Sequence, residues 1–553
     1  MIDNQVKRDQ DGDSRKMIVV AAGAALLIFL AFTFFARTPR SQLNVVQIAS
    51  LIVFAAVILR HGRTGAPSSS EHHPEPPPTR GVRWELLLAL ILSAGVYASV
   101  LSSYFIGDDY DTLFKFRSAP FEVLADLATR GLSGISLRPA GFLSLVLDYG
   151  IWRHNPFGYH LTNLLFHLIS VLGIYFLCKN LGLDRETSAS SALIFSILPI
   201  HPEAVVWISS RFDLMATCLI IWVAVLYLKF RQTGRWELYA LALFLSCVAM
   251  LSKEIAFMAP LLLLSLEYFA APNRDNRSPI LPLLGFALVT AATFGYRWIA
   301  LGGIGGYTHR DGSHAAYTLG FKTIEGLFLR APSQLLLGLN WYEPHVNRVV
   351  IIASLTAALM IILAFFYNPA RSNKGVIRFC LAWMLIGYAP AHFLIMIGPG
   401  LTNSRILYLS SAGLAVILAL LLSGIEHEVM RRAMKLALIL LLSLGLLHNV
   451  AAWRRVGDLS HELLMTLKIL VPDPPPNARF VIHQMPLYIE GIFYHGTLYQ
   501  AVNLTYNRAD LGARVEGAVV SGASAAPVNP ADPPTIRLKW VGKTNNLIEL
   551  VKD

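Results

Sequence analysis

Long apolar stretches separated by short polar segments dominate the sequence. The apolar residues come in blocks of about twenty, which is the length that an α-helix needs to cross the hydrocarbon core of a bilayer. These blocks predict about thirteen membrane-spanning helices, at residues 17–36, 43–60, 84–106, 159–178, 188–201, 213–230, 236–252, 255–271, 279–299, 348–367, 376–396, 406–424 and 435–452. The pattern therefore predicts an all-α polytopic membrane protein.

The pattern changes at the C-terminal end of the chain. Residues 479–483 and 535–541 alternate between apolar and polar side chains, as strands with one buried face do, and stretches rich in Gly and Pro lie between them. Residues 61–83, rich in Pro, Ser and His, read as a flexible connector. We therefore expect a two-helix hairpin with its linker over residues 1–83, a transmembrane domain over 84–452 and a small β-rich domain over 453–553.

Composition supports a membrane protein and indicates its orientation. The chain has 553 residues, of which 55% are hydrophobic and 15% charged, and an ordinary soluble protein has a charged fraction nearer a quarter. Its net charge of +11 comes without a basic face interleaved with aromatics, so no nucleic-acid partner is expected. Lys and Arg gather in the short connections on one side, which we assign to the cytoplasm together with the N-terminus. The longer loops and the tail after residue 452 then lie outside.

Cysteine spacing argues against a metal site or a disulfide framework. The chain has four cysteines, all inside apolar runs and none in a Cys-x-x-Cys pair: Cys178, Cys218, Cys247 and Cys380. We therefore expect neither a metal nor another cofactor.

An acidic pair, Asp108-Asp109, follows the predicted span 84–106 on the outer side. Adjacent carboxylates at the end of a span are costly unless water or a cation receives them. A carboxylate beside another is harder to ionise, which can tune a general base. The alternative is that both residues are solvated or cap the following helix.

Further polar groups recur at outer helix ends. Arg138-Pro139 precedes an apolar stretch, and His160, Asn163 and His167 share one face of a predicted helix. That face suggests buried hydrogen bonding, which serves either helix packing or ligand contact.

Three more outer turns carry charge. His201 and Glu203 end one span, and Arg211 and Asp213, which can pair with each other, open the next. Lys253-Glu254 follows at another turn, where it either snorkels or binds substrate. Arg405, three residues before Tyr408, enters a span from outside, where an arginine favours an anion such as a lipid phosphate.

Taken together and in this order, these motifs resemble those of the GT-C superfamily of polyprenyl-phosphate-sugar-dependent membrane glycosyltransferases. The pattern is most similar to that of the transmembrane O-mannosyltransferases that carry tetratricopeptide repeats. The matching segments are Asp108-Asp109, Arg138-Pro139, Tyr159-His160-Leu161-Thr162-Asn163, His201-Pro202-Glu203-Ala204-Val205, Arg211-Phe212-Asp213-Leu214, Lys253-Glu254 and Arg405-Ile406-Leu407-Tyr408. The chain departs from the family at Ser404, where a glutamate is usual, and it carries a short tail in place of the repeats.

The resemblance implies a mechanism and a set of partners. A polyprenyl-phosphate-linked sugar, mannose-like, is the expected donor, a protein or glycan is the acceptor, and membrane lipid surrounds the enzyme. Asp108 or Asp109 would be the general base of one inverting displacement. Arg405, Arg138 and Lys253 would bind the donor phosphate. The expected lining of the substrate site comprises His160, Asn163, His201, Glu203, Arg211, Asp213 and Tyr408.

Two other functions remain open at this stage. A transporter or flippase of lipid-linked glycans would place ionisable residues near the bilayer midplane and show inverted repeats, and neither pattern is evident in the sequence. A non-catalytic membrane scaffold is the second alternative, against which the acidic pair and the distant arginine argue. The expected location is a bacterial inner membrane, with the C-terminal domain in the periplasm, and the alternative is an endoplasmic-reticulum membrane with this domain in the lumen.

Overall fold

The structure is a computed structural model that is mostly helical. It describes residues 84–132, 135–270, 278–306, 331–338, 373–392, 401–425, 427–486, 488–490, 492–493, 496–516, 534–543 and 546–550. The predicted helices at 17–36, 43–60 and 348–367, like the linker 61–83, lie outside these residues.

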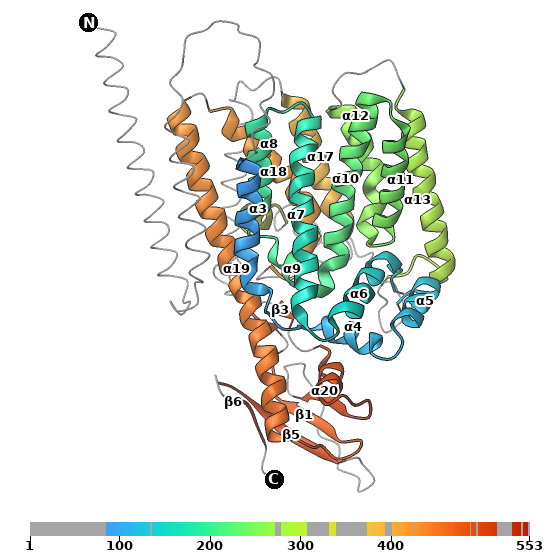
Figure 1. The fold of residues 1–553 in the computed structure, drawn as a ribbon, viewed down its shortest axis with the longest axis vertical. Helices are drawn as coiled ribbons and strands as arrows, with labels where there is room; N and C mark the ends of the chain where they lie inside the picture. The colour runs from blue at the N-terminus through green and yellow to red at the C-terminus, as the bar shows by residue number, and fades with distance from the viewer. Residues whose placement is uncertain are drawn as a thin grey trace, which may run out of the picture.

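A bundle of roughly parallel and antiparallel helices forms the larger part of the molecule (Figure 1). Its elements are α3 (Trp84–Tyr97), α7 (Pro156–Asn180), α8 (Arg185–Ser196), α10 (Arg211–Thr233), α11 (Trp236–Met250), α12 (Ala259–Phe269), α13 (Ile280–Leu301), α17 (Lys374–His392), α18 (Tyr408–Ser423) and α19 (Glu428–Leu470), with a short α15 (Ala331–Leu337). Five continuous helical segments among the described residues are long and apolar enough to cross a membrane. The chain is thus a multi-pass membrane protein.

Two predicted helices differ most in their bounds from the structure. The span expected at 84–106 ends earlier, because α3 stops at Tyr97 and a short 3-10 helix, η2 (Ala98–Val100), follows. The span expected at 435–452 is part of the much longer α19, which begins at Glu428 and continues to Leu470. Apolar composition marks the part of a helix in the bilayer and not where the helix ends, so the extension of α19 was missed.

Short helices gather at the end of the bundle toward which α19 extends (Figure 1). They are α4 (Asp108–Phe116), α5 (Pro120–Arg130), α6 (Pro139–Trp152), α9 (Pro202–Val206) and the 3-10 helices η3 (Ile208–Ser210), η4 (Glu254–Met258) and η8 (Ser404–Leu407). In α5, α6 and α9 a proline takes the first helical position, where its missing N–H costs nothing. The predicted motifs therefore lie together, because the loops that carry them meet at one end of the bundle.

A small sheet follows α19. Its four strands run in the order β4 (Gly512–Glu516), β1 (Arg479–His483), β5 (Thr535–Lys543) and β6 (Asn546–Leu550). The central strand β1 is parallel to β4 and β5, and β6 is antiparallel to β5. The two strands predicted from alternation, 479–483 and 535–541, are confirmed. A two-stranded hairpin, β2 (Tyr488–Ile489) and β3 (Ile492–Phe493), and α20 (Leu498–Tyr506) complete this tail.

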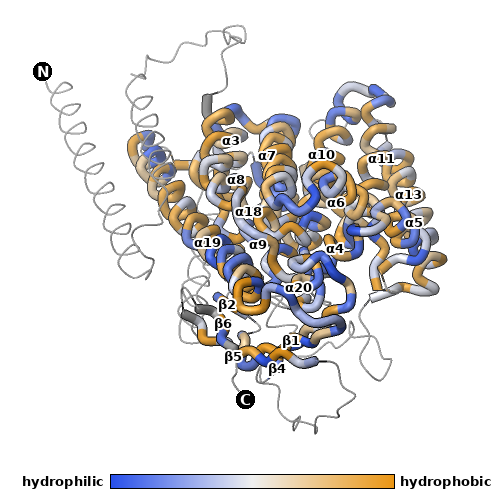
Figure 2. The backbone as a smooth tube through the Cα atoms, turned by 60° about the horizontal axis from the view of Figure 1, so that its bottom comes forward, coloured by the Kyte–Doolittle hydropathy of each residue, from blue (hydrophilic) through white to orange (hydrophobic). Residues whose placement is uncertain are grey.

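Hydropathy separates these parts (Figure 2). Apolar residues dominate the bundle helices, whereas hydrophilic segments gather around α4 and α20.

Small residues let the bundle helices approach closely. A Cβ on Gly173 of α7 would lie 2.7 Å from Ile221 of α10, and one on Gly413 of α18 would lie 2.6 Å from the carbonyl of Cys380 on α17. These close contacts fix the positions of the helices whose ends carry the predicted motifs.

Candidate functional site

A cavity of about 180 Å³ lies where the end of the bundle meets α4 and the tail. Its walls come from five separate parts of the chain. The lining residues are Asp108, Pro202, Glu203, Trp207, Leu401, Thr402, Asn403, Ser404, Arg405, Asn449, Trp453, Tyr488 and Ile492. The cavity thus contains a carboxylate from α4 and an arginine from η8, which are separated by almost three hundred residues in the sequence.

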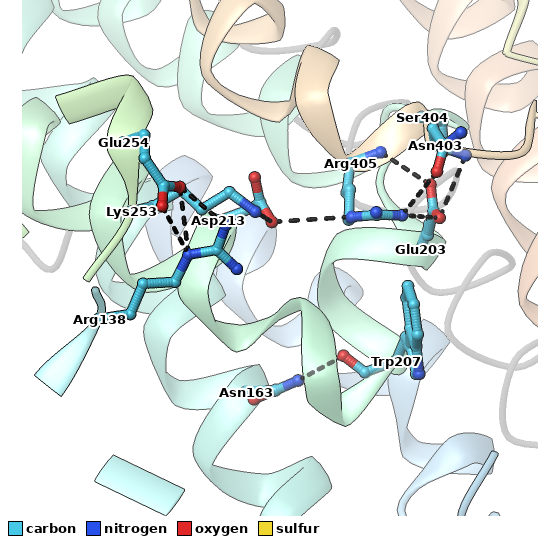
Figure 3. Close-up of polar contacts among 10 residues, drawn as sticks. All are labelled: Arg138, Asn163, Glu203, Trp207, Asp213, Lys253, Glu254, Asn403, Ser404 and Arg405. Carbon is cyan, nitrogen blue, oxygen red and sulfur yellow. Dashed lines mark hydrogen bonds and ion pairs between the residues drawn. The ribbon is translucent and has the colours of Figure 1, made fainter. Parts of the chain in front are cut away.

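Glu203 of α9 organises the segment that carries Arg405 (Figure 3). Its Oε2 accepts hydrogen bonds from the Arg405 backbone N–H at 2.9 Å and from the Ser404 hydroxyl at 3.1 Å. Its Oε1 accepts from the Asn403 backbone N–H at 3.2 Å and from Nη1 of Arg405 at 2.5 Å. One buried carboxylate therefore fixes both the backbone and the guanidinium of this segment.

Other contacts hold the Arg405 side chain in place. Its guanidinium lies 5.0 Å above the ring of Trp207, a cation–π arrangement. Its Nε lies 3.8 Å from Oδ2 of Asp213, which also accepts a hydrogen bond from Nζ of Lys253 at 2.9 Å. Arg405, on the cavity wall, is thereby positioned between the carboxylates of Glu203 and Asp213.

The sequence left open whether Arg211 and Asp213 pair with each other. In the structure Arg211 pairs with Asp148, and Asp213 pairs with Lys253.

A second charged cluster lies beside the first (Figure 3). Glu254 receives hydrogen bonds from Nε and Nη2 of Arg138, the latter at 2.8 Å, and from Nη1 of Arg297 at 3.2 Å. Burial alone would raise the pKa of Glu254, but Arg138, Lys253 and Arg297 outweigh it and lower the pKa to about 2. Arg138 and Lys253 therefore lie within a network that leads to Arg405 and do not line the cavity itself.

The two aspartates of the acidic pair have different surroundings. Asp108, the first residue of α4, is exposed in the cavity. The protein around it restricts its hydration and raises its pKa, while the charge of Arg405 acts in the opposite direction. A carboxylate at a helix N-terminus also faces the positive end of the helix dipole. Asp108 is thus the carboxylate of this pair that a substrate in the cavity can reach.

Asp109 is buried and its oxygens are occupied. Oδ1 accepts from the backbone N–H of Ser209 at 2.8 Å and from its hydroxyl at 2.6 Å, and Oδ2 accepts from the N–H of Ile106 at 3.1 Å. Burial raises its pKa to about 7, although these hydrogen bonds oppose the shift. Gly107, which lies between Ile106 and the start of α4, has φ +54°, a conformation that glycine adopts without the steric cost of a Cβ atom. Asp109 therefore ties the turn before α4 to η3.

Arg211 is completely buried at the start of α10. Its guanidinium donates to Asp148, to Oδ1 of Asn163 at 2.7 Å and to the carbonyl of Tyr159 at 2.7 Å. The amide of Asn163 in turn donates to the carbonyls of Val205 and Trp207. This cluster joins α6, α7 and α10 below the cavity and does not open into it.

The polar face predicted on α7 is buried and hydrogen-bonded, as expected. His160 Nε2 contacts the carbonyl of Ser103 at 3.1 Å, and His167 Nδ1 contacts the hydroxyl of Tyr408 at 2.7 Å. His201 Nε2 lies 2.8 Å from the hydroxyl of Ser411, and its ring packs 4.6 Å from that of Tyr408. These contacts join α7 to the segment after η2, and join α7 and the start of α9 to α18. Over the described residues no group of three or more His, Cys, Asp or Glu is arranged to hold a metal ion.

The structure divides the predicted site residues into two groups. Asp108, Glu203 and Arg405 line one cavity, while Asp213 and Lys253 support Arg405 from behind. The others take part in helix contacts or in the adjoining cluster, where Arg138 is half-buried and the rest are buried: Asp109, Arg138, His160, Asn163, His201, Arg211 and Tyr408. Sequence reasoning missed the lining residues Trp207, Asn403, Trp453 and Tyr488. Trp207 lies two residues after the end of the His201 motif, and this proximity is a signal in the sequence, whereas no sequence pattern marked Trp453 or Tyr488.

Comparison with known proteins identifies related sequences. Residues 140–296 match the family described as dolichyl-phosphate-mannose-protein mannosyltransferase. Protein O-mannosyl-transferase TMTC3 of Homo sapiens is 35% identical over 22% of this chain and 13% of its own length. Protein O-mannosyl-transferase F38B6.6 of Caenorhabditis elegans is 27% identical over 40% of this chain and 33% of its own length. The matches thus span a third or less of these relatives.

A solved structure covers more of the chain. The crystal structure of ArnT from Cupriavidus metallidurans bound to undecaprenyl phosphate covers 83% of this chain and 94% of its own, at 11% identity and a TM-score of 0.44. The family resemblance that the motifs predicted is confirmed at the level of sequence: residues 140–296, which run from α6 into α13, match the mannosyltransferase family, and named O-mannosyl-transferases are similar to part of the chain.

Proposed function

We propose that this protein is a membrane glycosyltransferase that moves a mannose-like sugar from a polyprenyl-phosphate donor to a hydroxyl of a protein or glycan acceptor. The observation that carries the proposal is the single cavity lined by both Asp108 and Arg405. A carboxylate that can accept a proton and a guanidinium that can stabilise a phosphate are the two groups that such a transfer needs. The names of the related O-mannosyl-transferases support the choice of sugar and of acceptor.

The proposed reaction is one displacement at the anomeric carbon. The acceptor oxygen gives its proton to Asp108 and forms the new bond to that carbon from the face opposite the phosphate. The bond from the anomeric carbon to the phosphate oxygen breaks, and its electron pair leaves with the polyprenyl phosphate. Arg405 stabilises the charge on the departing phosphate, and the configuration of the sugar is inverted. The raised pKa of Asp108 strengthens it as a base.

The surrounding residues have supporting parts in this proposal. Glu203 and Asp213 hold Arg405 in position, so the guanidinium is ordered before the donor arrives. Arg138 and Lys253 contribute positive potential near the cavity rather than direct phosphate contacts. Asp109 holds the turn that presents Asp108. In this proposal Asp108 is thus the general base, and Asp109 positions it.

The location of the reaction belongs to the same proposal. Lys and Arg concentrate in the short connections that we assign to the cytoplasm. The cavity and the tail would then face the outside of a bacterial inner membrane, where a lipid-linked donor presents its sugar. Residues 84–452 would form the catalytic domain and 453–553 the outer domain.

The test is transfer from a radiolabelled polyprenyl-phosphate mannose in membranes that contain the wild type, Asp108→Asn or Asp109→Asn at matched expression. We expect Asp108→Asn to lower transfer by about 10²- to 10⁴-fold, the usual contribution of a general base. Asp109→Asn keeps the cavity carboxylate and should retain a measurable part of the activity.

Two results would contradict the proposal. Equal transfer by the wild type and Asp108→Asn would remove this carboxylate from catalysis. Absence of transfer by the wild type with several polyprenyl-phosphate sugars and a lysate of acceptors would exclude the glycosyltransferase and favour transport or a scaffold.

A further inference from the structure

The tail contributes directly to the cavity. The hairpin formed by β2 and β3 places Tyr488 and Ile492 among the lining residues, together with positions that come from the bundle. Ile492 is buried, whereas Tyr488 is 40% exposed. Both belong to the part of the chain that lies outside the segment matched by the mannosyltransferase family, residues 140–296. This wall is therefore a feature that the family match does not describe.

The hairpin is held against α19 by a salt bridge. Glu490, at the turn between β2 and β3, receives hydrogen bonds from Nε and Nη2 of Arg455, the first at 2.8 Å. Two parallel bonds between a guanidinium and a carboxylate fix orientation as well as distance. Arg455 lies two residues after Trp453, which lines the same cavity. The salt bridge therefore fixes the position of Tyr488 relative to the part of the cavity wall that α19 forms.

The side from which Tyr488 reaches the cavity indicates its substrate. The tail lies beyond the end of the bundle, on the side away from the spanning helices (Figure 1). A polyprenyl-linked donor arrives from the bilayer, because its chain stays among the lipids. An acceptor arrives from the aqueous side, on which the tail lies. A phenol ring offers such an acceptor a large apolar face and a polar edge.

We propose that Tyr488, on the hairpin fixed by Glu490 and Arg455, contacts the acceptor and determines which acceptor is used. The inference rests on the proposed glycosyltransferase activity and adds a specificity-determining residue to it. The bundle supplies the base and the phosphate-binding arginine, and the tail supplies the surface that recognises the molecule being modified. Replacing the tail would then change the acceptor without changing the donor.

The first test compares Tyr488→Ala with Tyr499→Ala. Tyr499 of α20 is 38% exposed, packs against Phe114 and does not line the cavity, so its loss is a matched control. The acceptor probes are a synthetic peptide rich in serine and threonine and an octyl mannoside. We expect Tyr488→Ala to raise the KM of the better probe about tenfold, the effect of losing one aromatic contact, and to leave the KM of the donor unchanged. Tyr499→Ala should leave both constants unchanged.

The second test perturbs the hairpin without touching the cavity lining. Arg455→Glu and Glu490→Arg each break the salt bridge and place like charges together, so each should raise the acceptor KM. The double variant restores an opposite pair and should recover most of the loss, which a merely unfolded tail would not do.

Each remaining outcome has a defined meaning. An unchanged acceptor KM in Tyr488→Ala, a rise confined to the donor KM, or an equal rise in Tyr499→Ala would overturn the assignment of Tyr488 while wild-type transfer still stands. Absence of wild-type transfer to either probe and to a lysate of acceptors would instead contradict the glycosyltransferase itself.

Discussion

Glu203 binds Arg405 twice, through the backbone N–H and through the guanidinium, so that one carboxylate sets both the path of the chain and the direction of the side chain. The two residues lie on different helices, α9 and η8, and their contact closes one side of the cavity. Ser404, which stands where the resemblance of the sequence motifs leads one to expect a glutamate, donates its hydroxyl to the same Glu203. The arginine thus has a carboxylate partner although the neighbouring position lacks one.

Replacing Glu203 by glutamine should weaken this arrangement. The amide keeps one acceptor oxygen in place of two and loses the charge, and a hydrogen bond to a charged group contributes about 1.5–3 kcal/mol. We expect the donor KM to rise by about tenfold or more and the apparent Tm in detergent to fall. Glu237→Gln removes an exposed carboxylate of α11 and is the control. A donor KM equal to that of the wild type would show that Glu203 does not position Arg405.

Asp109 should make stability depend on pH. Its pKa is raised to about 7 by burial, whereas the unfolded chain has a value near 3.8. The folded protein therefore holds the proton more tightly, and the stability gained is present below pH 4 and lost as pH rises to about 7. We expect the apparent Tm of the wild type to fall between pH 4.5 and pH 7.5 by more than that of Asp109→Asn.

The matched variant for this measurement is Asp126→Asn, which neutralises an exposed carboxylate of α5. Its Tm should follow that of the wild type across the same pH range. A profile of Asp109→Asn that coincides with both would show that this carboxyl is not the source of the pH dependence.

Arg211 should be essential for folding rather than for substrate binding. It is fully buried, and Arg211→Ala would leave Asp148 without its charged partner in the protein interior. Breaking a buried ion pair on one side costs about 3–5 kcal/mol. We expect a large fall in Tm or in folded yield, and a partial recovery when Asp148→Ala is added.

Arg130→Ala serves as the reference, because Arg130 pairs with Asp126 on the surface, where such a pair contributes about 0–1 kcal/mol. A stable Arg211→Ala protein with a raised donor KM would instead place this arginine in the substrate site.

The sequence was informative where a single segment determines its own environment. The apolar lengths of α7, α10 and α18 match the predicted spans, and the alternation at 479–483 and 535–541 identifies β1 and β5. The polar face of α7 was expected to be buried because three polar groups recur at helical spacing within an apolar run. These properties depend on local periodicity, which a sequence displays directly.

The partners of the charged residues were not predictable in the same way. Arg211 pairs with Asp148 and not with its neighbour Asp213, because helix packing brings α6 beside α10. Arg138 and Lys253 were expected at the donor phosphate, yet the carboxylates of Glu254 and Asp213 engage them. Tyr488 lies at the cavity because the tail folds back so that its β2–β3 hairpin forms part of the cavity wall. Such contacts join distant segments, and no local pattern encodes them.

The uninterrupted helix α19 acts as a spacer of fixed length. Its 43 residues correspond to about 65 Å at 1.5 Å per residue, roughly twice the thickness of the hydrocarbon core. A large part of it therefore stands outside the bilayer and carries the sheet at a constant height above the lipid surface. Under the proposed function, an acceptor segment would have to fit between the sheet and the lipid surface to reach the cavity, so that the distance of a hydroxyl from the membrane becomes a criterion of selection alongside its chemistry.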